Sequence, residues 1–342
     1  MGAPRKSGYE MAMKAIVYRA YGSADVLALE EVERPAPGDG EVLIRVRAAS
    51  VNPLDAHFMR GKPYIARIAM GLTRPKRTRP GVDVAGEVEA VGAGVTRFRP
   101  GDAVFGACRG GAFADFVCAP EARLAAKGPG LMFEQAASLP VAGLTALQGL
   151  RDKGGIQPGR KVLINGAAGG IGTFAVQIAK AYGADVTGVC STGNMDLVRS
   201  IGADRVIDYT KEDFTRSGES YDLILDAVGN LWFSACRRVL MPNGILVAAG
   251  GGVGPHGPRL GPLAARLLSG LLRSRFTKQK LIVLMGKMEA EDLTSLAALV
   301  ESGKIVPVLD LRHGLGEVRE AIRYVAGGHA RGKVVVTMDS DL

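Results

Sequence analysis

Short apolar runs between Gly and Pro turns characterise the first part of the chain. Residues 14–18, 41–47 and 82–91 alternate between apolar and polar positions or run apolar. This pattern is typical of short strands in an antiparallel or barrel-like sheet. We therefore expect a β-rich domain in the N-terminal part of the chain.

From about residue 160 the pattern changes to apolar runs separated by helix-length segments. Continuous runs of this kind, alternating with helices, indicate a parallel sheet covered on both faces. The sequence therefore predicts a doubly wound nucleotide-binding domain in an α/β protein. The expected strands are 161–164, 185–189, 205–207, 221–225 and 245–248, and the first expected helices are 171–182 and 195–201.

The C-terminal part mixes strands and helices, and we expect its last strand to return to the first domain. The expected elements are strand 281–285, a helix beginning near 289–292, strand 306–309, a helix from about 315 and strand 333–338. The expected division is a disordered leader (1–13), a catalytic domain (14–138 and 276–342) and a nucleotide-binding domain (139–275).

Composition and charge narrow the class of protein. With 342 residues, 47% hydrophobic and 23% charged, the chain is long enough for two globular domains. The net charge of +9 is dispersed and no nucleic-acid motif accompanies it, so we expect no nucleic-acid partner. The four cysteines form no CxxC pair, which favours a reducing compartment. No apolar run is long enough to cross a bilayer, and we expect a soluble, cytoplasmic protein.

The strongest chemical signal is a strand that runs into a glycine turn at 162–172, where a helix opens. Glycines let the backbone approach a pyrophosphate, and the helix N-terminus offers N–H groups to the anion. The alternative is tight turn packing alone. The pattern predicts dinucleotide binding, with these candidate residues: Gly166, Ala168, Gly169, Gly170, Ile171 and Gly172.

The end of the next strand bears on which nucleotide is bound. An NAD site usually places a carboxylate there, about twenty residues beyond the glycines, for the ribose hydroxyls. This sequence instead has Ser191, Thr192 and Asn194, with no acidic residue until Asp196. Their donors suit a 2′-phosphate, which favours NADPH. The alternative is that they only cap the helix that begins near Met195.

These motifs and several others together resemble the zinc-independent quinone oxidoreductase branch of the medium-chain dehydrogenase/reductase superfamily. The resemblance covers nearly the whole chain after Lys14, and it implies a GroES-like β-rich catalytic domain joined to a Rossmann domain. The motifs that carry it are 50–55, 80–86, 139–146, 165–172, 190–194, 201–209, 226–229 and 330–336.

The resemblance also implies that no metal takes part in catalysis. Zinc-dependent relatives have a Cys ligand and a His-Glu pair where this chain has Asn52 and then Val82-Asp83. Only Cys108 and Cys118 lie near the expected four-cysteine structural lobe, which needs four ligands. Without a Lewis acid, the chemistry left is reduction of a quinone or an activated double bond.

The resemblance assigns residues on the nicotinamide side of the cofactor. It implies that Asn52 and Asp55 lie beside the nicotinamide ribose. It also implies that Thr145 contacts the nicotinamide half and that Gly250 and Gly251 back the ring.

Further residues are assigned to the rest of the cofactor. Tyr209 is similar to an adenosine-side aromatic residue of the family, and Asp226 and Val228 belong to the motif at 226–229. Arg331 or Lys333 could reach a phosphate from the returning C-terminal strand. The alternative is that either one is ordinary surface charge.

His57 stands where some relatives carry a tyrosine in the substrate pocket. It is a candidate proton donor to the developing enolate or quinol oxygen. The alternative is a structural histidine, with solvent water as the proton source.

Two basic segments have no place in this chemistry. We expect the loop 74–79 to be solvated, with acidic substrates or a membrane surface as alternative partners. The stretch 259–275 has Leu at helical spacing with Arg among them, typical of a basic amphipathic helix. We expect its leucines to pack in the core or over a pocket, and the alternatives are contact with another subunit or with lipid.

The sequence therefore predicts an NADPH-dependent reductase that transfers hydride to small electrophiles, either quinones or α,β-unsaturated carbonyls. One alternative is an enoyl-thioester reductase. Another is an NADPH-binding sensor or interaction protein without turnover, because fold and function separate readily. The family resemblance also implies a homodimer, formed through edge strands of the nucleotide-binding domain.

Overall fold

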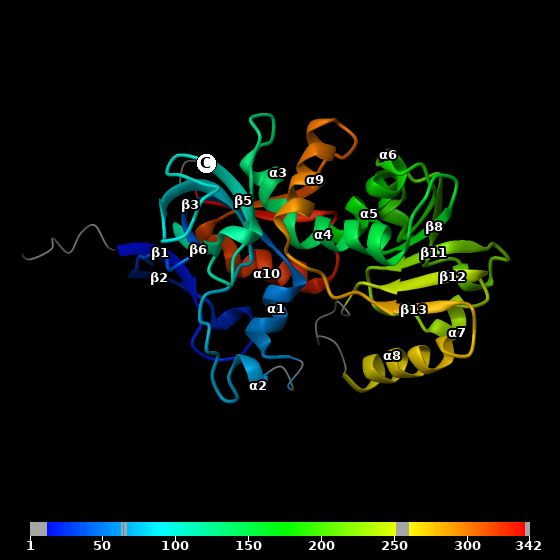
Figure 1. Cartoon of the computed structure of the whole chain (residues 1–342). Coiled ribbons are helices and arrows are strands. Elements are labelled where there is room, and N and C mark those ends of the chain that lie inside the picture. The colour runs from blue at the N-terminus through cyan, green and yellow to red at the C-terminus, as the bar shows by residue number, and fades with distance from the viewer. Residues whose placement is uncertain (1–11, 63, 65–66, 251–259, 339–342) are drawn as a thin grey trace, which may run out of the picture.

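A computed structural model of the chain describes residues 12–62, 64, 67–250 and 260–338. It has two lobes, each built around its own sheet, with helix α4 (Pro140–Gln148) between them (Figure 1). Helix α4 packs against helix α5 (Gly170–Ala181) of one lobe and helix α9 (Ala290–Glu301). The predicted α/β fold with two domains is confirmed.

The first lobe is the predicted β-rich domain. Its seven-stranded sheet has the order β14-β15-β3-β4-β5-β7, with β6 paired to β3, and a two-stranded sheet β1-β2 accompanies it. All its pairs are antiparallel except β14 with β15. The strands are β1 (Ala12–Val17), β2 (Ala28–Glu33), β3 (Glu41–Val51), β4 (Asp83–Val91), β5 (Ala103–Ala107), β6 (Phe116–Pro120), β7 (Leu124–Ala126), β14 (Leu309–Gly314) and β15 (Lys333–Thr337).

The C-terminal strand returns to this lobe, as predicted. β15 pairs antiparallel with β3, so that Val335 lies opposite Ser50. The expected strand 306–309 is wrong, because β14 begins at Leu309. The Gln177 carboxamide instead accepts a hydrogen bond from the Val306 N–H at 2.8 Å and donates one to the Val306 C=O at 3.0 Å. In a strand, a neighbouring strand would make these two bonds.

The second lobe is a parallel sheet with the order β10-β9-β8-β11-β12-β13. Helices α5 and α6 cover one face, and α7 and α8 cover the other (Figure 1). This arrangement confirms the doubly wound prediction. The elements are β8 (Lys161–Asn165), β9 (Asp185–Cys190), β10 (Arg205–Asp208), β11 (Tyr221–Asp226), β12 (Leu240–Ala248), β13 (Lys280–Val283), α6 (Met195–Ser200), α7 (Phe233–Cys236) and α8 (Leu260–Ser274).

Three expected boundaries differ from the structure. β13 pairs with β12 in the parallel sheet, so the nucleotide-binding domain extends past residue 275. β13 ends at Val283 rather than 285, and Met285 is exposed. Residues 12 and 13 pair with 33 and 32 in β1-β2, so the expected leader 1–13 is too long, and its residues 1–11 lie outside the described part of the chain.

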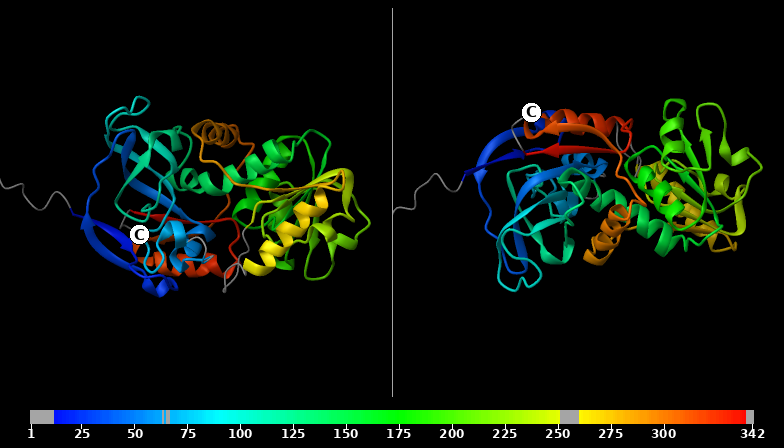
Figure 2. Two further views of the ribbon diagram at one scale, coloured as in Figure 1. Left: turned by 60° about the horizontal axis from the view of Figure 1, so that its bottom comes forward. Right: turned by 90° about the horizontal axis from the view of Figure 1, so that it is seen from above.

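The remaining helices lie at the junction of the lobes or cover the first lobe. Seen from two further directions, α10 and β15 lie along one side of the β-rich lobe, and β15 leads from the junction away from the second lobe (Figure 2). These helices are α1 (Pro53–Arg60), α2 (Arg67–Met70), α3 (Phe133–Ser138) and α10 (Val318–Gly327).

Candidate active site

The glycine turn after β8 packs too closely for side chains at two positions. Gly166 has φ +82°, and a Cβ there would lie 2.7 Å from Cγ2 of Val228. A Cβ on Gly172 would lie 2.0 Å from the carbonyl oxygen of Gly166. The start of α5 therefore lies directly against the end of β8, and its first N–H groups point to the site where an anion would bind.

The C-terminal segment of the other lobe forms a wall of this turn. The Gly332 N–H donates to the Ala168 carbonyl at 2.9 Å, and Gly169 and Gly332 form an isolated parallel bridge. A Cβ on Gly170 would meet Cδ of Lys333 at 3.2 Å. The turn is thus shared by the two lobes.

The loop after β9 presents the predicted polar residues beside this turn. Asn194 Nδ2 donates to Ser191 Oγ at 3.1 Å, while the buried Asn194 Oδ1 has no hydrogen-bond partner within the described chain. The Arg331 guanidinium lies 3.8 Å from the position of a Cβ on Gly193. The loop thus combines a guanidinium, a hydroxyl and an unsatisfied carboxamide oxygen, which suits the adenosine ribose and phosphate of a dinucleotide.

A carboxylate that the sequence reasoning missed adjoins this loop. Asp208, at the end of β10, is buried and accepts hydrogen bonds from the hydroxyls of Thr192 and Thr210. The hydrogen bond from Thr192, more than any other contact, lowers the pKa of Asp208 to about 2. Its place directly after the expected strand 205–207 is the sequence signal that could have revealed it. The neighbouring Tyr209 is exposed, so its ring is available for stacking.

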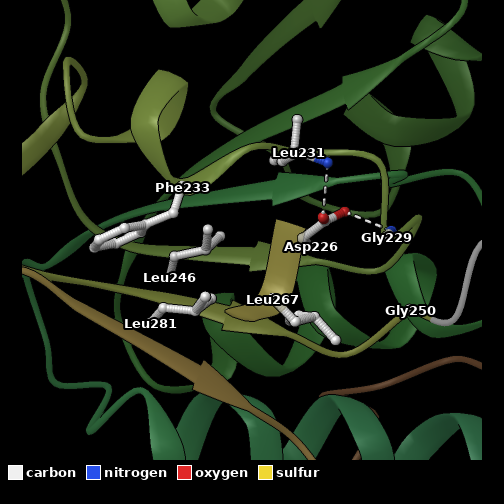
Figure 3. Close-up of a pocket in the computed structure, with 9 residues that line it drawn as sticks. Asp226, Gly229, Leu231, Phe233, Leu246, Gly250, Leu267 and Leu281 are labelled. Carbon is white, nitrogen blue, oxygen red and sulfur yellow. Dashed lines mark hydrogen bonds between the residues drawn. The ribbon is translucent and has the colours of Figure 1, made fainter. Parts of the chain in front are cut away.

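Asp226, at the end of β11, organises a loop. Its carboxylate accepts a hydrogen bond from Asn165 Nδ2 at 2.8 Å. It also accepts from the N–H groups of Gly229 and Leu231 at 2.9 and 3.3 Å, and Figure 3 draws these two bonds. It also accepts from the Val228 N–H at 3.1 Å. Asp226 therefore positions this loop over Gly166 and has little capacity left to hold a ligand itself.

Gly250 follows β12 beside the same loop. A Cβ on Gly250 would lie 2.3 Å from the Ala227 carbonyl oxygen, so the two segments are in direct contact. A small apolar pocket beneath α8 includes Gly250, Phe233 and Leu267 (Figure 3). Gly251 and residues 252–259 lie outside the described residues, so the structure leaves the prediction for Gly251 untested.

Thr145 and His57 lie on helices at the junction. Thr145, on α4, is half-buried, and its hydroxyl donates to the Val141 carbonyl at 2.6 Å. His57, on α1, is also half-buried. Burial, and then the charge of Arg60, lowers the pKa of its imidazole.

Asn52 and Lys333 belong to a buried polar cluster, together with Asp83 and Ser50. Lys333 Nζ donates to Asn52 Oδ1 at 2.6 Å and lies 3.5 Å from Asp83 Oδ2. That carboxylate oxygen also accepts from Asn52 Nδ2 and Ser50 Oγ, each at 2.8 Å. The Lys333 ammonium is buried and bonded within the cluster, so neither prediction for this residue, a phosphate contact or an ordinary surface charge, fits the structure.

Asp55 adjoins the cluster at the start of α1. Its carboxylate accepts from the N–H groups of Asn52 and Gly81 at 2.8 and 3.2 Å. Burial, opposed by these bonds, raises the pKa of Asp55 to about 7. Asn52 and Asp55 are 2% and 1% exposed, and their expected position beside the nicotinamide ribose stays a prediction.

At the positions that the resemblance assigns to the Cys ligand and the His-Glu pair, this chain has Asn52 and Val82-Asp83, and Asn52 and Asp83 are both bonded to the Lys333 ammonium. Among residues 12–62, 64, 67–250 and 260–338, no three His, Cys, Asp or Glu side chains gather as a metal site would require. A lysine in contact with both groups disfavours a divalent cation there, because like charges repel at short range.

Comparisons with known proteins agree with this architecture. The family model described as an alcohol dehydrogenase GroES-like domain matches residues 38–129, and that of a zinc-binding dehydrogenase matches residues 201–336. A chloroplastic quinone oxidoreductase of Triphysaria versicolor is 34% identical over 339 residues, covering 95% of this chain and 98% of the relative. The chloroplastic NADPH-dependent alkenal/one oxidoreductase of Arabidopsis thaliana is 36% identical over 338 residues, covering 95% and 79%.

Solved structures show the same fold. The quinone oxidoreductase from Coxiella burnetii has a TM-score of 0.83 and 30% identity, covering 96% of this chain and 100% of that one. A GroES-like lobe joined to a Rossmann lobe, with a glycine turn shared between them, defines a pyridine-nucleotide-dependent oxidoreductase. The chain belongs to the medium-chain dehydrogenase/reductase superfamily, in its quinone oxidoreductase-like branch.

Proposed function

We propose that the protein is an NADPH-dependent, zinc-independent reductase that transfers hydride to quinones or α,β-unsaturated carbonyls. One observation carries the proposal: the glycine turn, the loop 191–194 and Arg331 meet at the ends of β8 and β9. The relatives named as quinone and alkenal/one oxidoreductases support this substrate class.

The chain's residues would bind and orient the cofactor. The start of α5 would hold the pyrophosphate, Tyr209 would stack on the adenine, and Gly250 would allow close approach of the nicotinamide half. Thr145 would contact that half from α4. NADPH, when bound, would supply the hydride, so the protein needs mainly to position the two reactants and exclude water.

We propose NADPH over NADH because of the groups around the loop 191–194. Arg331 would pair with a 2′-phosphate, and Ser191 would donate to it. Asp208 is turned to the hydroxyls of Thr192 and Thr210 rather than left open to ribose hydroxyls. A carboxylate satisfied in this way discriminates less against a phosphate than an open one would.

Two sources of the proton remain in the proposal. His57, with its lowered pKa, would donate to the product oxygen only when protonated, which becomes rarer as the pH rises above that pKa. Water would serve otherwise. Replacing His57 with Phe separates the two: loss of turnover with unchanged NADPH affinity supports His57, and unchanged turnover supports water.

The test of the proposed function follows NADPH and NADH oxidation at the nicotinamide absorbance. Acceptors are naphthoquinones, phenanthrenequinone, alkenals and a crotonyl thioester, each with and without a chelator. We expect chelator-resistant NADPH oxidation with quinones or enones. Chelator sensitivity would overturn the zinc-independent part. A preference for the thioester would favour an enoyl-thioester reductase, and NADPH binding without turnover would favour a sensor.

We further propose a homodimer formed through an edge strand of the parallel sheet, such as β13, and a cytoplasmic location. None of the described helices is long and apolar enough to cross a membrane. Sedimentation velocity tests the dimer: a single species at monomer mass would contradict it.

A further inference from the structure

Helix α8 has an apolar face that nothing in the described chain covers. Leu268 and Leu272 lie one turn apart and are 68% and 63% exposed, and Phe276, just after the helix, is 80% exposed. The opposite side of α8 packs on the sheet at Gly270, where a Cβ would meet Leu281 and Phe233 at 2.4 and 3.1 Å. The expected core packing of the stretch 259–275 is therefore wrong for Leu268 and Leu272. Residue 259 and the side chains of 260–264 and 266 lie outside the described part of the chain.

The charge around this face is of one sign. The chain has no Asp or Glu between Asp226 and Glu289, while Lys and Arg recur between them. Exposed basic residues flank the leucines. We call this group the α8 patch: Leu268, Leu271, Leu272, Arg273, Arg275, Phe276 and Lys278.

A second patch of the same kind lies on the other lobe. Tyr64, Ile68 and Leu72 are 62%, 71% and 70% exposed around α2, and no acidic residue occurs between Asp55 and Asp83. The Arg67 guanidinium lies over the Tyr64 ring, 4.9 Å from its centroid. We call this group the α2 patch: Tyr64, Ile68, Leu72, Arg74, Lys76 and Arg77.

The helices that carry the two patches lie on the same side of the molecule. α2 and α8 lie along the lower side in Figure 1, one on each lobe, and both come forward when that side is turned to the viewer (left of Figure 2). Two apolar groups with basic rims on one side make a surface with two points of attachment. Such attachment strengthens binding to an extended partner more than to a small one.

The combination of exposed apolar and basic side chains in the two patches indicates which kind of partner fits them. A symmetric pair of chains joined through this side would oppose basic residues to basic residues. A nucleic acid would use the charges but not the exposed leucines. An anionic lipid bilayer uses both, because apolar side chains enter the headgroup boundary while Lys and Arg reach lipid phosphates.

We propose that the side of the molecule carrying the α2 and α8 patches docks peripherally onto an anionic lipid bilayer. The proposal is independent of the proposed reductase function, since neither patch contains a residue assigned to the cofactor. It takes up the membrane surface that was an alternative partner for the loop 74–79, whose expected solvation stays a prediction.

The test is flotation of the whole protein with vesicles, once with phosphatidylcholine alone and once with about 30% phosphatidylglycerol added. We expect flotation with the anionic vesicles only, and its loss as salt rises. Arg273→Gln with Arg275→Gln should weaken binding about 30-fold, at roughly fivefold for each charge. Equal binding to both kinds of vesicle, or to neither, would overturn the proposal.

Matched controls separate the patches from general effects. Leu272→Asn and Phe276→Asn should each weaken flotation, whereas Leu29→Asn, an exposed leucine on β2, should not. Arg99→Gln is the corresponding control for charge. Phe276 follows the helix, so its replacement reports on the surface even if Leu272→Asn lowers the stability of α8. If the patch variants float as the wild type does, the proposal fails.

Two further readouts distinguish other outcomes. NADPH oxidation with a water-soluble quinone, measured for each variant without vesicles, reports on the proposed function alone. Sedimentation velocity shows whether Leu272→Asn changes the oligomeric state. A dimer that this change splits, with no vesicle binding by the wild type, would assign the surface to a second copy of the chain and overturn the lipid proposal.

Discussion

The loop 191–194 and the cluster around Lys333 are both rich in polar side chains, but their groups are satisfied differently. In the loop, Asn194 Oδ1 has no partner in the described chain and Arg331 is exposed. In the cluster, Asn52 and Asp83 are buried and bonded to Lys333 and to each other. A site that receives a ligand keeps hydrogen-bonding capacity open, whereas a cluster without open capacity fixes the shape of its surroundings.

The cluster gives the largest expected effect. Lys333→Met keeps most of the stem but leaves the buried Asp83 carboxylate without its cation. We expect the free energy of unfolding to fall by roughly 3–5 kcal/mol in urea denaturation. The control is Lys180→Met, which removes a partly exposed pair with Asp204 and should cost no more than about 1 kcal/mol. Adding Asp83→Asn to Lys333→Met should recover part of the loss, and equal stability of Lys333→Met and wild type would refute a structural role.

The next largest effect is expected for NADPH binding, from a substitution in the glycine turn. Gly172→Ala places a methyl group 2.0 Å from the Gly166 carbonyl oxygen, so α5 must move away from the turn. Overpacking of this kind costs about 1–3 kcal/mol, and we expect NADPH affinity, measured by fluorescence titration, to fall about tenfold. Gly327→Ala on α10, where a Cβ meets nothing within 4 Å, is the control. Unchanged affinity in Gly172→Ala would place the cofactor elsewhere.

Asp55 makes the free energy of unfolding depend on pH. Its pKa of about 7 in the folded protein is above the ordinary value of 3.8, so the folded state binds the proton more tightly than the unfolded state. This contribution to stability is complete below about pH 4 and is lost as the pH rises to about 7, so the free energy of unfolding falls across this range. Asp55→Asn should flatten the decline in unfolding free energy measured between these pH values. A variant with the wild-type slope would contradict the assignment.

The smallest expected effect is on nucleotide binding and comes from Arg331, beside the loop 191–194. Arg331→Ala should weaken NADPH binding about fivefold to tenfold and leave NADH binding nearly unchanged, because only NADPH carries the 2′-phosphate. Arg312→Ala, on β14 and paired with Glu134, is the control. Equal weakening of both nucleotides would show that Arg331 contacts a part they share.

Much of the fold follows from the apolar pattern. Continuous β-branched runs are typical of strands buried on both faces, and five of the six parallel strands were predicted within the nucleotide-binding domain. The sixth, β13, was predicted as a strand but placed in the wrong domain. The strand at 306–309 failed because Gln177, far away in sequence, supplies the backbone partners of Val306. Local pattern carries no information on such a partner.

The site was predicted less completely than the fold. The glycine turn and the loop 191–194 each lie in one stretch of sequence, where strand, turn and helix follow in order. The cluster joins residues of β3, β4 and β15, and only the register of β15 on β3 brings Lys333 to Asn52. Asp208 was overlooked for a related reason, since β10 neighbours β9 only in the folded sheet.

The position of β15 also sets an order of events during synthesis. The nucleotide-binding sheet is complete once Val283 has been made, whereas the other sheet needs its last strand, Lys333–Thr337, between β14 and β3. Domains generally fold as units while the chain emerges. The sheet of the earlier lobe therefore stays incomplete, with residues 48–51 of β3 unpaired on one edge, until almost the whole chain has left the ribosome. The wall that Gly332 adds to the glycine turn is likewise among the last parts of the protein to form.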